Sequence, residues 1–347
     1  MKHIARADTL AASLVSELSS VPLPSANAGA PSAMLARCPR AGRTPLVTSA
    51  HLAEITGVAE VTLKDERNRM GLGSFKALGA AYVIAQDASA GTVRNRTYVT
   101  ASAGNHGLSV AAGAQAFGAR AVVYLADTVP DAFANRLAEH GADVRRQGPV
   151  YEDSMAEAAR VAEENGWTLL SDSSWPGYLD IPHRLMEGYT VLMQEAASDM
   201  APPTHIFLQA GVGGLAAACA AYAREVWGEQ PRIVVVEPDA APALFESVKL
   251  GAPATTTGPA SDMGRLDCKE PSLIALRGLA RDANDYILIS EHEGARGAAV
   301  AAEADLATTP SGAAGLSGLL AASDHRDALG LSPSSRVLLI LSEEMPT

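Results

Sequence analysis

Short apolar runs alternate with segments of helical periodicity along most of the chain. Runs rich in β-branched residues between turn residues predict strands, whereas apolar positions three and four apart predict helices. Strands are expected at 58–64, 97–101, 121–125, 143–146, 167–171, 206–209, 233–237, 286–290 and 337–341. Helices are expected at 51–56, 77–88, 108–117, 131–140, 152–164, 182–200, 215–227, 242–250 and 272–281, with two more before the last strand. Residues 1–34, with one possible helix at 10–18, are expected to form a surface arm or lead-in.

The alternation of strands and helices predicts an α/β fold with open, parallel-rich sheets covered by helices on both faces. The chain has 347 residues, of which 48% are hydrophobic, so two lobes are expected. In such sheets ligands bind beyond the carboxyl ends of the strands. The three chemically suggestive segments of this chain all fall at those ends.

The net charge and the cysteine content limit which binding partners and which cellular compartment are expected. A formal net charge of −12 provides no basic field for nucleic acid or an anionic membrane surface, so a small polar metabolite is the expected partner. The three cysteines show no metal-ligand spacing, no metal site is expected, and their odd count fits a reducing compartment. No apolar run reaches the roughly 18 residues needed to span a bilayer, and no secretory signal pattern is seen. A cytoplasmic protein is therefore expected.

The first suggestive segment is 71–79, in which Lys76 stands among small and apolar residues after the polar run 64–69. A lysine is normally kept in water, so an apolar setting suggests that its neutral amine serves as a nucleophile. The alternative is a lysine that only opens a surface helix, which is far commoner. Lys76 is a candidate catalytic residue whose role depends on the other two segments.

The second segment, 102–107, is a glycine-containing loop at the end of a predicted strand. Its backbone N–H groups, the Ser102 hydroxyl and the Asn105 amide suit a carboxylate ligand. In the alternative, Asn105 and His106 only cap the helix that follows. The candidate substrate-binding residues are Ser102, Ala103, Gly104 and His106.

The third segment, 211–215, is a glycine loop between a strand and a helix. Its backbone N–H groups and the helix N-terminus can receive a phosphate without a cationic side chain. Read as far as Ala216, the same residues satisfy the dinucleotide fingerprint, and Glu237 stands where a ribose-binding acid would. A nicotinamide-dependent oxidoreductase is thus the rival interpretation, and a tight turn without a ligand is another.

With these segments the chain resembles the fold type II (tryptophan synthase β-like) pyridoxal phosphate enzymes, and most of all the diaminopropionate ammonia-lyases. The resemblance covers about 44–342 and rests on the motifs above together with 173–178, 236–239 and 268–271. It implies pyridoxal 5'-phosphate (PLP) as cofactor, an amino-acid substrate and a homodimer. It also implies a large cofactor-binding domain, 1–76 with 186–347, and a smaller substrate-side domain, 77–185.

The resemblance also implies roles for single residues. Lys76 would form the Schiff base with the cofactor, Asn105 would lie beside its ring hydroxyl, and Ser342 would meet its pyridine nitrogen. The phosphate would be held by Gly211, Val212, Gly213, Gly214 and Leu215. A neutral partner for the nitrogen limits carbanion build-up and favours rapid loss of a β-substituent, so elimination is the expected chemistry.

The implied reaction is an ammonia-lyase reaction on a short L-amino acid, 2,3-diaminopropionate first, giving pyruvate and ammonia. Lys76 would take the Cα proton, and Asp172 would hold the β-ammonium. The alternative is that Asp172 only caps a turn. Ala103 departs from the ammonia-lyases, which carry there an aspartate implied as the base for D-substrates, and resembles the serine and threonine dehydratases. L-Serine, L-threonine or hydroxyaspartate is therefore the second substrate class.

Two further expectations concern the chain as a whole. A catalytically silent metabolite-binding protein is the alternative outside the enzymes, and intact Lys76, Asn105 and Ser342 argue against it. The loop 251–270 is rich in Gly, Pro, Thr and Ser, and it is expected to order over bound substrate as a mobile cover.

Overall fold

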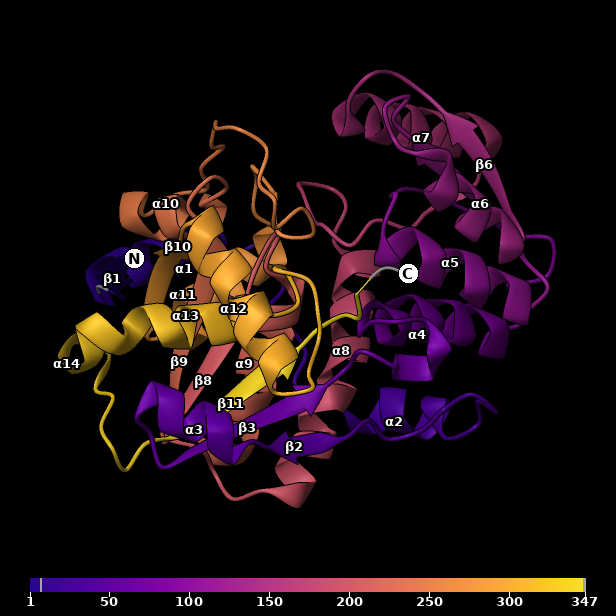
Figure 1. Ribbon diagram of the computed structural model, residues 1–347. Coiled ribbons are helices and arrows are strands. Elements are labelled where there is room, and N and C mark those ends of the chain that lie inside the picture. Colours follow the sequence, from indigo (N-terminus) through magenta and orange to yellow (C-terminus); the bar gives the residue numbers. More distant parts are fainter. Residues whose placement is uncertain (7, 346–347) are drawn as a thin grey trace.

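The computed structural model describes residues 1–6 and 8–345, which form an α/β structure with two sheets (Figure 1). The smaller sheet is wholly parallel, with the order β6 (Ala142–Arg146), β5 (Arg120–Leu125), β4 (Thr97–Ala101), β7 (Thr168–Leu169). The larger sheet has seven strands, in the order β1 (Lys2–Ala5), β10 (Asp285–Ile289), β9 (Arg232–Pro238), β8 (His205–Gln209), β11 (Arg336–Leu341), β3 (Glu60–Asp65), β2 (Leu46–Thr48). Only its edge strands β1 and β2 pair antiparallel, so the expectation of parallel-rich sheets is confirmed.

The interior strands β8, β9 and β11 of the larger sheet are largely apolar on both faces, because helices cover both sides (Figure 1). Ile206 and Leu208 face one core and Phe207 faces the other, as the alternating pleat requires. The helices are α1 (Asp8–Glu17), α2 (Gly29–Leu35), α3 (Ala50–Thr56), α4 (Lys76–Ser89), α5 (Asn105–Ala116), α6 (Asp131–Glu139), α7 (Tyr151–Asn165), α8 (Asp180–Asp199), α9 (Gly214–Trp227), α10 (Ala243–Leu250), α11 (Leu273–Asp282), α12 (Glu291–Glu303), α13 (Ala314–Ala321) and α14 (Arg326–Leu329), with short 3₁₀ helices η1 (Arg69–Gly71) and η2 (Ala322–His325).

The expectation of a surface arm at 1–34 is wrong. β1 extends the larger sheet by pairing with β10, and Leu14 of α1 is fully buried in the main core. A four-residue edge strand is too short for its alternation to be recognised, and its pairing partner, residues 285–288, lies near the other end of the chain. The helix expected from Pro182 begins at Asp180, because proline is tolerated in the first turn of a helix.

The two sheets use different parts of the chain. Strands before residue 76 and after 186 build the larger sheet, and strands between them build the smaller one. Helix α8 crosses residue 186 and packs against both α4 and α9, so it joins the two lobes. The exact division into domains at 76 and 186 remains a prediction.

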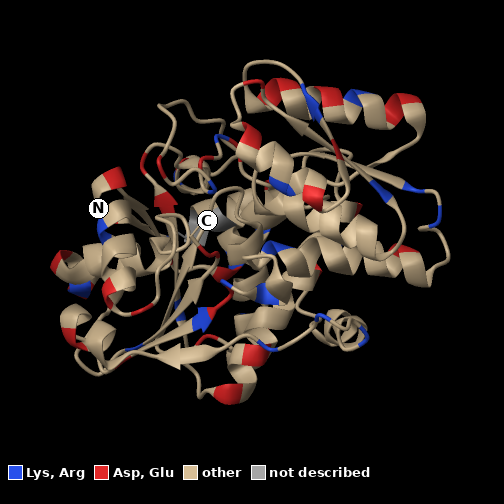
Figure 2. Ribbon diagram, turned by 45° about the vertical axis from the view of Figure 1, so that its right-hand side comes forward, with Lys and Arg blue, Asp and Glu red and all other residues tan. Residues whose placement is uncertain are grey.

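Acidic and basic residues are interspersed on the ribbon of both lobes (Figure 2). Within residues 1–6 and 8–345, no helix has both the length and the apolar character needed to cross a membrane. The same residues contain no group of three or more His, Cys, Asp or Glu side chains that could hold a metal ion.

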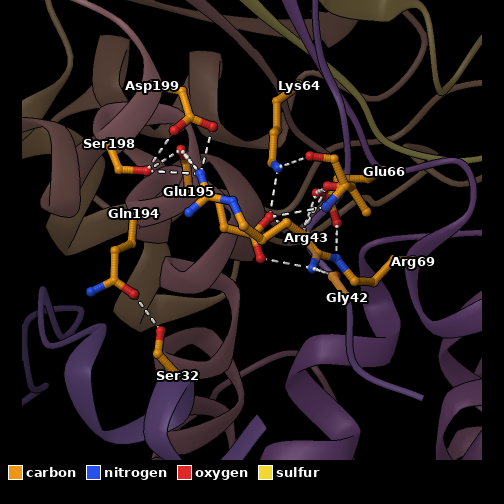
Figure 3. A network of polar contacts seen from close by, with 11 residues as sticks. Ser32, Gly42, Arg43, Lys64, Glu66, Arg69, Gln194, Glu195, Ser198 and Asp199 are labelled. Carbon is orange, nitrogen blue, oxygen red and sulfur yellow. Dashed lines mark hydrogen bonds and ion pairs between the residues drawn. The ribbon is translucent and has the colours of Figure 1, made fainter. Parts of the chain in front are cut away.

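Four buried charges tie the end of β3 to α8 (Figure 3). The Lys64 ammonium donates to Glu195 at 2.6 Å, and the Arg69 guanidinium donates to Glu66 and Glu195 at 2.7–3.0 Å. Thr44 accepts from both cations, through its carbonyl and its hydroxyl. The side chains of Lys64, Glu66 and Arg69 are at most 1% exposed. The polar run 64–69 is therefore largely buried. In the network itself, the positive charges of Lys64 and Arg69 balance the negative charges of Glu66 and Glu195.

We expect Glu195→Gln to destabilise the fold, because it leaves two buried cations with one carboxylate. Breaking one partner of a buried ion pair costs about 3–5 kcal/mol, which urea unfolding followed by circular dichroism would measure. The exposed Glu303 offers a matched control, since Glu303→Gln should change the free energy of unfolding by less than about 0.5 kcal/mol. Equal losses in the two variants would contradict the structural role of Glu195.

Wild type and Glu195→Gln should also differ in how their free energy of unfolding depends on pH. Burial raises the pKa of Glu195, but hydrogen bonds and charge from Arg69 and Lys64 outweigh it and hold the pKa below its ordinary value. The stabilisation from Glu195 is therefore present above the unfolded-state pKa of about 4.3 and lost as the pH falls through the lower folded-state pKa. The difference in stability between wild type and Glu195→Gln should shrink over that acid range.

Candidate active site

The turn that presents Lys76 is fixed by the segment after β11. The Phe75 N–H donates to the Ser342 carbonyl at 3.2 Å, and Ser74 forms an isolated β-bridge with Glu343. Gly73 has a φ of +77°, which L side chains rarely adopt, and a Cβ there would clash with the side chain of Glu344. Lys76 therefore begins α4 close to the carboxyl end of β11.

Lys76 forms an ion pair with Asp172, which lies in the loop between β7 and α8. The side chains are only 22% and 20% exposed. Burial favours the neutral amine, but the Asp172 carboxylate outweighs it and raises the pKa of Lys76 above its ordinary value. Burial would also raise the pKa of Asp172, and the Lys76 ammonium instead holds that pKa well below its usual range. The structure thus brings together the two predicted catalytic residues as a charged pair.

Lys76 is distinct among the five lysines of the chain. Lys64 is committed to the buried charge network, and Lys269 donates to two backbone carbonyls and a carboxylate at 2.7–2.9 Å. Lys2 and Lys249 are exposed on an edge strand and a surface helix. Lys76 is the lysine whose amine lies beside the predicted loops, 5.2 Å from the centroid of the Phe75 ring.

Asn105 opens α5, and its side-chain amide donates to Glu343 Oε2 at 2.6 Å. The backbone carbonyl of Asn105 accepts from the Ser109 hydroxyl at 2.6 Å, whereas its side-chain oxygen Oδ1 accepts no hydrogen bond from any described residue. Glu343 is buried and also accepts from the Thr309 hydroxyl. Burial raises the pKa of the Glu343 carboxyl above its ordinary value. Ser342, directly before it, is buried, and its hydroxyl has no hydrogen-bond partner in the described part of the chain.

In the predicted substrate loop 102–107, the side chain of His106 contacts the protein interior. The His106 ring is buried, its Nε2 lies 2.8 Å from the Leu170 carbonyl oxygen, and burial lowers the pKa of the ring. A neutral ring that donates to this carbonyl ties α5 to the chain after β7. The Ser102 hydroxyl accepts from the Gly104 N–H at 3.2 Å, and Ala103 packs against an apolar cluster. His106 is placed to support the loop, and Ser102 and Gly104 to shape it.

The glycine loop 211–215 follows β8 and runs into α9. Gly213 has a φ of +96°, and a Cβ on Gly211 would come within 3.0 Å of the Leu266 backbone. The backbone N–H groups of residues 213–216 have no acceptor in the described part of the chain, as expected at a helix N-terminus. These glycines leave a group of aligned donors open to an anion.

Glu237 does not fit the rival nicotinamide interpretation. Its carboxylate oxygens accept from the backbone N–H groups of Leu244 and Phe245 at 2.8 and 2.7 Å. The residue is 1% exposed, and burial raises its pKa to about 8. Glu237 holds α10 against β9, and it is not free to bind a ribose.

Sequence reasoning missed three residues beside these loops. Glu343 contacts Asn105, and Arg265 from the loop 251–270 lies 3.6 Å from Glu343. Tyr151 opens α7 and is 52% exposed as a residue, but burial of its hydroxyl end and the charge of Asp172 raise the pKa of that hydroxyl. The acidic pair that follows Ser342 was a visible signal for Glu343. Nothing local marks the other two, because tertiary packing brings them to the site.

The chain matches the family model described as pyridoxal-phosphate dependent enzyme over residues 38–343. It is 34% identical to a diaminopropionate ammonia-lyase of Salmonella typhimurium over 88% of this chain and 86% of that protein. Among solved structures, diaminopropionate ammonia lyase from Escherichia coli in complex with D-serine superposes with a TM-score of 0.88 at 26% identity, covering 99% of this chain and 93% of that chain. The same enzyme in complex with an aminoacrylate-PLP azomethine reaction intermediate gives a TM-score of 0.84 at 27% identity, covering 99% and 93%.

The chain therefore belongs to the pyridoxal-phosphate dependent enzymes of fold type II, and its cofactor is PLP. Within that class it is similar to the diaminopropionate ammonia-lyases. The residues present fit the cofactor. The unpaired amides at 213–216 suit its single phosphate, the Lys76 amine suits its aldehyde, and the free side-chain oxygens of Asn105 and Ser342 suit its ring.

We expect Asp172→Asn to change the titration of Lys76 in the cofactor-free protein. Without the carboxylate, burial dominates and the pKa of Lys76 falls below its ordinary value, so a larger fraction of the amine is neutral. Competitive acetylation at pH 9, followed by peptide mass analysis, should show Lys76 at least about tenfold more reactive than in wild type, since each pKa unit changes the neutral fraction tenfold. Exposed Lys249 serves as the internal reference. Unchanged Lys76 reactivity would show that Asp172 does not control this amine.

Proposed function

We propose that the protein is a PLP-dependent β-eliminating lyase that releases pyruvate and ammonia from a short L-amino acid, with 2,3-diaminopropionate as the preferred substrate. The observation that carries this proposal is the ion pair between Lys76 and Asp172. It places a primary ammonium on a carboxylate within a mostly buried site. A substrate with a β-ammonium offers the same chemical group.

The reaction balances as one diaminopropionate and one water giving one pyruvate and two ammonia. The Cα–H and Cβ–N bonds break, the β-nitrogen leaves as ammonia, and hydrolysis of the remaining C–N bond releases the second. PLP supplies the electron sink that makes the Cα proton removable. Lys76 is the general base for that proton, and Asp172 keeps the β-nitrogen protonated so that it leaves as a neutral amine.

The remaining site residues bind and orient. The amides of the loop 211–215 hold the cofactor phosphate, and Asn105 and Ser342 orient its ring. The loop 102–107 receives the substrate carboxylate. These roles are supported by the position of the loop 102–107, the loop 211–215 and Ser342, which follow the carboxyl ends of β4, β8 and β11.

A dehydratase reaction on L-serine, L-threonine or hydroxyaspartate is the second candidate. The observation that favours it is the apolar packing of Ala103, which leaves no proton acceptor at a position where the ammonia-lyases carry an acid. The ammonia-lyase and dehydratase reactions would use the same base, Lys76. They differ in the leaving group on Cβ that lies beside Asp172.

We also propose a cytoplasmic homodimer with the domain division at 76 and 186. The family resemblance supports the dimer and the division, and the three free cysteine thiols support a reducing compartment.

Asp172→Asn should separate the two substrate classes. Removing a charge-assisted contact worth about 1.5–3 kcal/mol lowers kcat/KM for L-2,3-diaminopropionate roughly 10- to 100-fold. L-Serine has no β-ammonium, so its kcat/KM should fall much less. Pyruvate release from both substrates measures the effect. An equal loss on the two would reduce Asp172 to a structural role.

The stereochemistry of proton removal depends on Ala103. A D-isomer needs a base on the cofactor face opposite Lys76, and alanine has none. Wild type should therefore release pyruvate from L-isomers only, whereas Ala103→Asp should gain measurable activity on D-2,3-diaminopropionate. Comparable wild-type rates on the D- and L-isomers would reveal a second base.

A further inference from the structure

Arg265 spans two of the loops that form the site. Its backbone packs on the glycine loop, since a Cβ on Gly211 would come within 3.2 Å of the Arg265 carbonyl oxygen. Its own N–H donates to the Ser311 hydroxyl at 3.2 Å, which fixes the start of the side chain. The side chain then reaches the loop 102–107, where a Cβ on Gly104 would lie 3.5 Å from Arg265 Nε.

The guanidinium of Arg265 is held weakly. Its Nε lies 3.6 Å from Glu343 Oε2, which is an ion pair beyond hydrogen-bond distance. It donates no side-chain hydrogen bond to any described residue, although a guanidinium carries five N–H donors in a planar fork. Glu343, in contrast, already accepts from Asn105 and Thr309. Arg265 therefore has unused donors that face the predicted carboxylate loop.

The N-terminus of α5 lies at the same place. The backbone N–H groups of 105–107 have no acceptor in the described part of the chain. A carboxylate seated there would meet these amides from one side and the Arg265 fork from the other. Planar bidentate pairing is the geometry that a guanidinium makes with a carboxylate.

We propose that Arg265 is the side chain that recognises the substrate's α-carboxylate, and that Glu343 holds the guanidinium in its place when no substrate is bound. This assignment rests on the proposed function, and it restricts the substrates to amino acids with a free α-carboxylate. Because Arg265 belongs to the loop 251–270, exchange of Glu343 for the substrate carboxylate also ties that loop to the bound substrate. Recognition of the carboxylate thereby stabilises the loop.

Binding of L-alanine to the holoenzyme tests the proposal without turnover, because L-alanine has no β-leaving group. Calorimetry should show that Arg265→Gln weakens L-alanine roughly 10- to 100-fold, and that Arg265→Lys recovers part of the loss. L-Alaninamide, which lacks the carboxylate, should bind weakly to wild type and should not respond to the substitution. Arg37→Gln, at an exposed arginine whose side chain has no hydrogen-bond or ion-pair partner in the described chain, is the control and should match wild type.

Glu343→Gln should act in the opposite direction. It removes the competing charge at nearly the same side-chain size, with an NH2 group in place of one of the two acceptor oxygens, so L-alanine should bind more tightly. Hydrogen exchange of 251–270 should slow on addition of L-alanine to wild type and should stay fast in Arg265→Gln at the same concentration. Unchanged L-alanine affinity in Arg265→Gln, or an equal loss for L-alaninamide, would overturn the assignment.

The outcome is separable from that of the proposed function. Carboxylate-dependent binding through Arg265, with no pyruvate from L-2,3-diaminopropionate, L-serine, L-threonine or hydroxyaspartate, would refute the lyase and support Arg265. Pyruvate release with Arg265-independent binding would overturn Arg265 alone.

Discussion

The charged pair of Lys76 and Asp172 is the interaction on which the site depends. A mostly buried amine would lose its proton, yet the carboxylate reverses that tendency and keeps it charged. The pair joins the start of α4 to the loop before α8, two segments that are separated by 96 residues. Any ligand that engages the Lys76 amine frees Asp172 to hold another cation, which is what a β-ammonium substrate would supply.

The surrounding framework makes that pair possible. The buried charges of Lys64, Glu66, Arg69 and Glu195 fix the chain after β3, and the backbone contacts of Ser342 and Glu343 fix the turn before Lys76. Lys76, the proposed cofactor lysine, is thus positioned from both sides by interactions that do not involve the cofactor. This arrangement suits an enzyme whose lysine must return to the same place after each turnover.

The sequence predicted most interior strands because they are apolar on both faces, as β8 and β9 illustrate. It missed β1 and β2, whose pairing is set by distant partners rather than by their own pattern. Among site residues, Lys76, Asn105 and the loop 211–215 stand in recognisable local motifs. Arg265 stands in an irregular loop, and only loop packing brings it to the site.

Borohydride reduction of the holoenzyme tests the central claim most directly, because it fixes the cofactor covalently to the amine that holds it. The chain has only five lysines, so digestion and mass spectrometry can assign the adduct without ambiguity. We expect the reduced cofactor on the peptide that contains Lys76 and on no other. An adduct on Lys2, Lys64, Lys249 or Lys269, or a holoenzyme that yields no adduct at all, would contradict it.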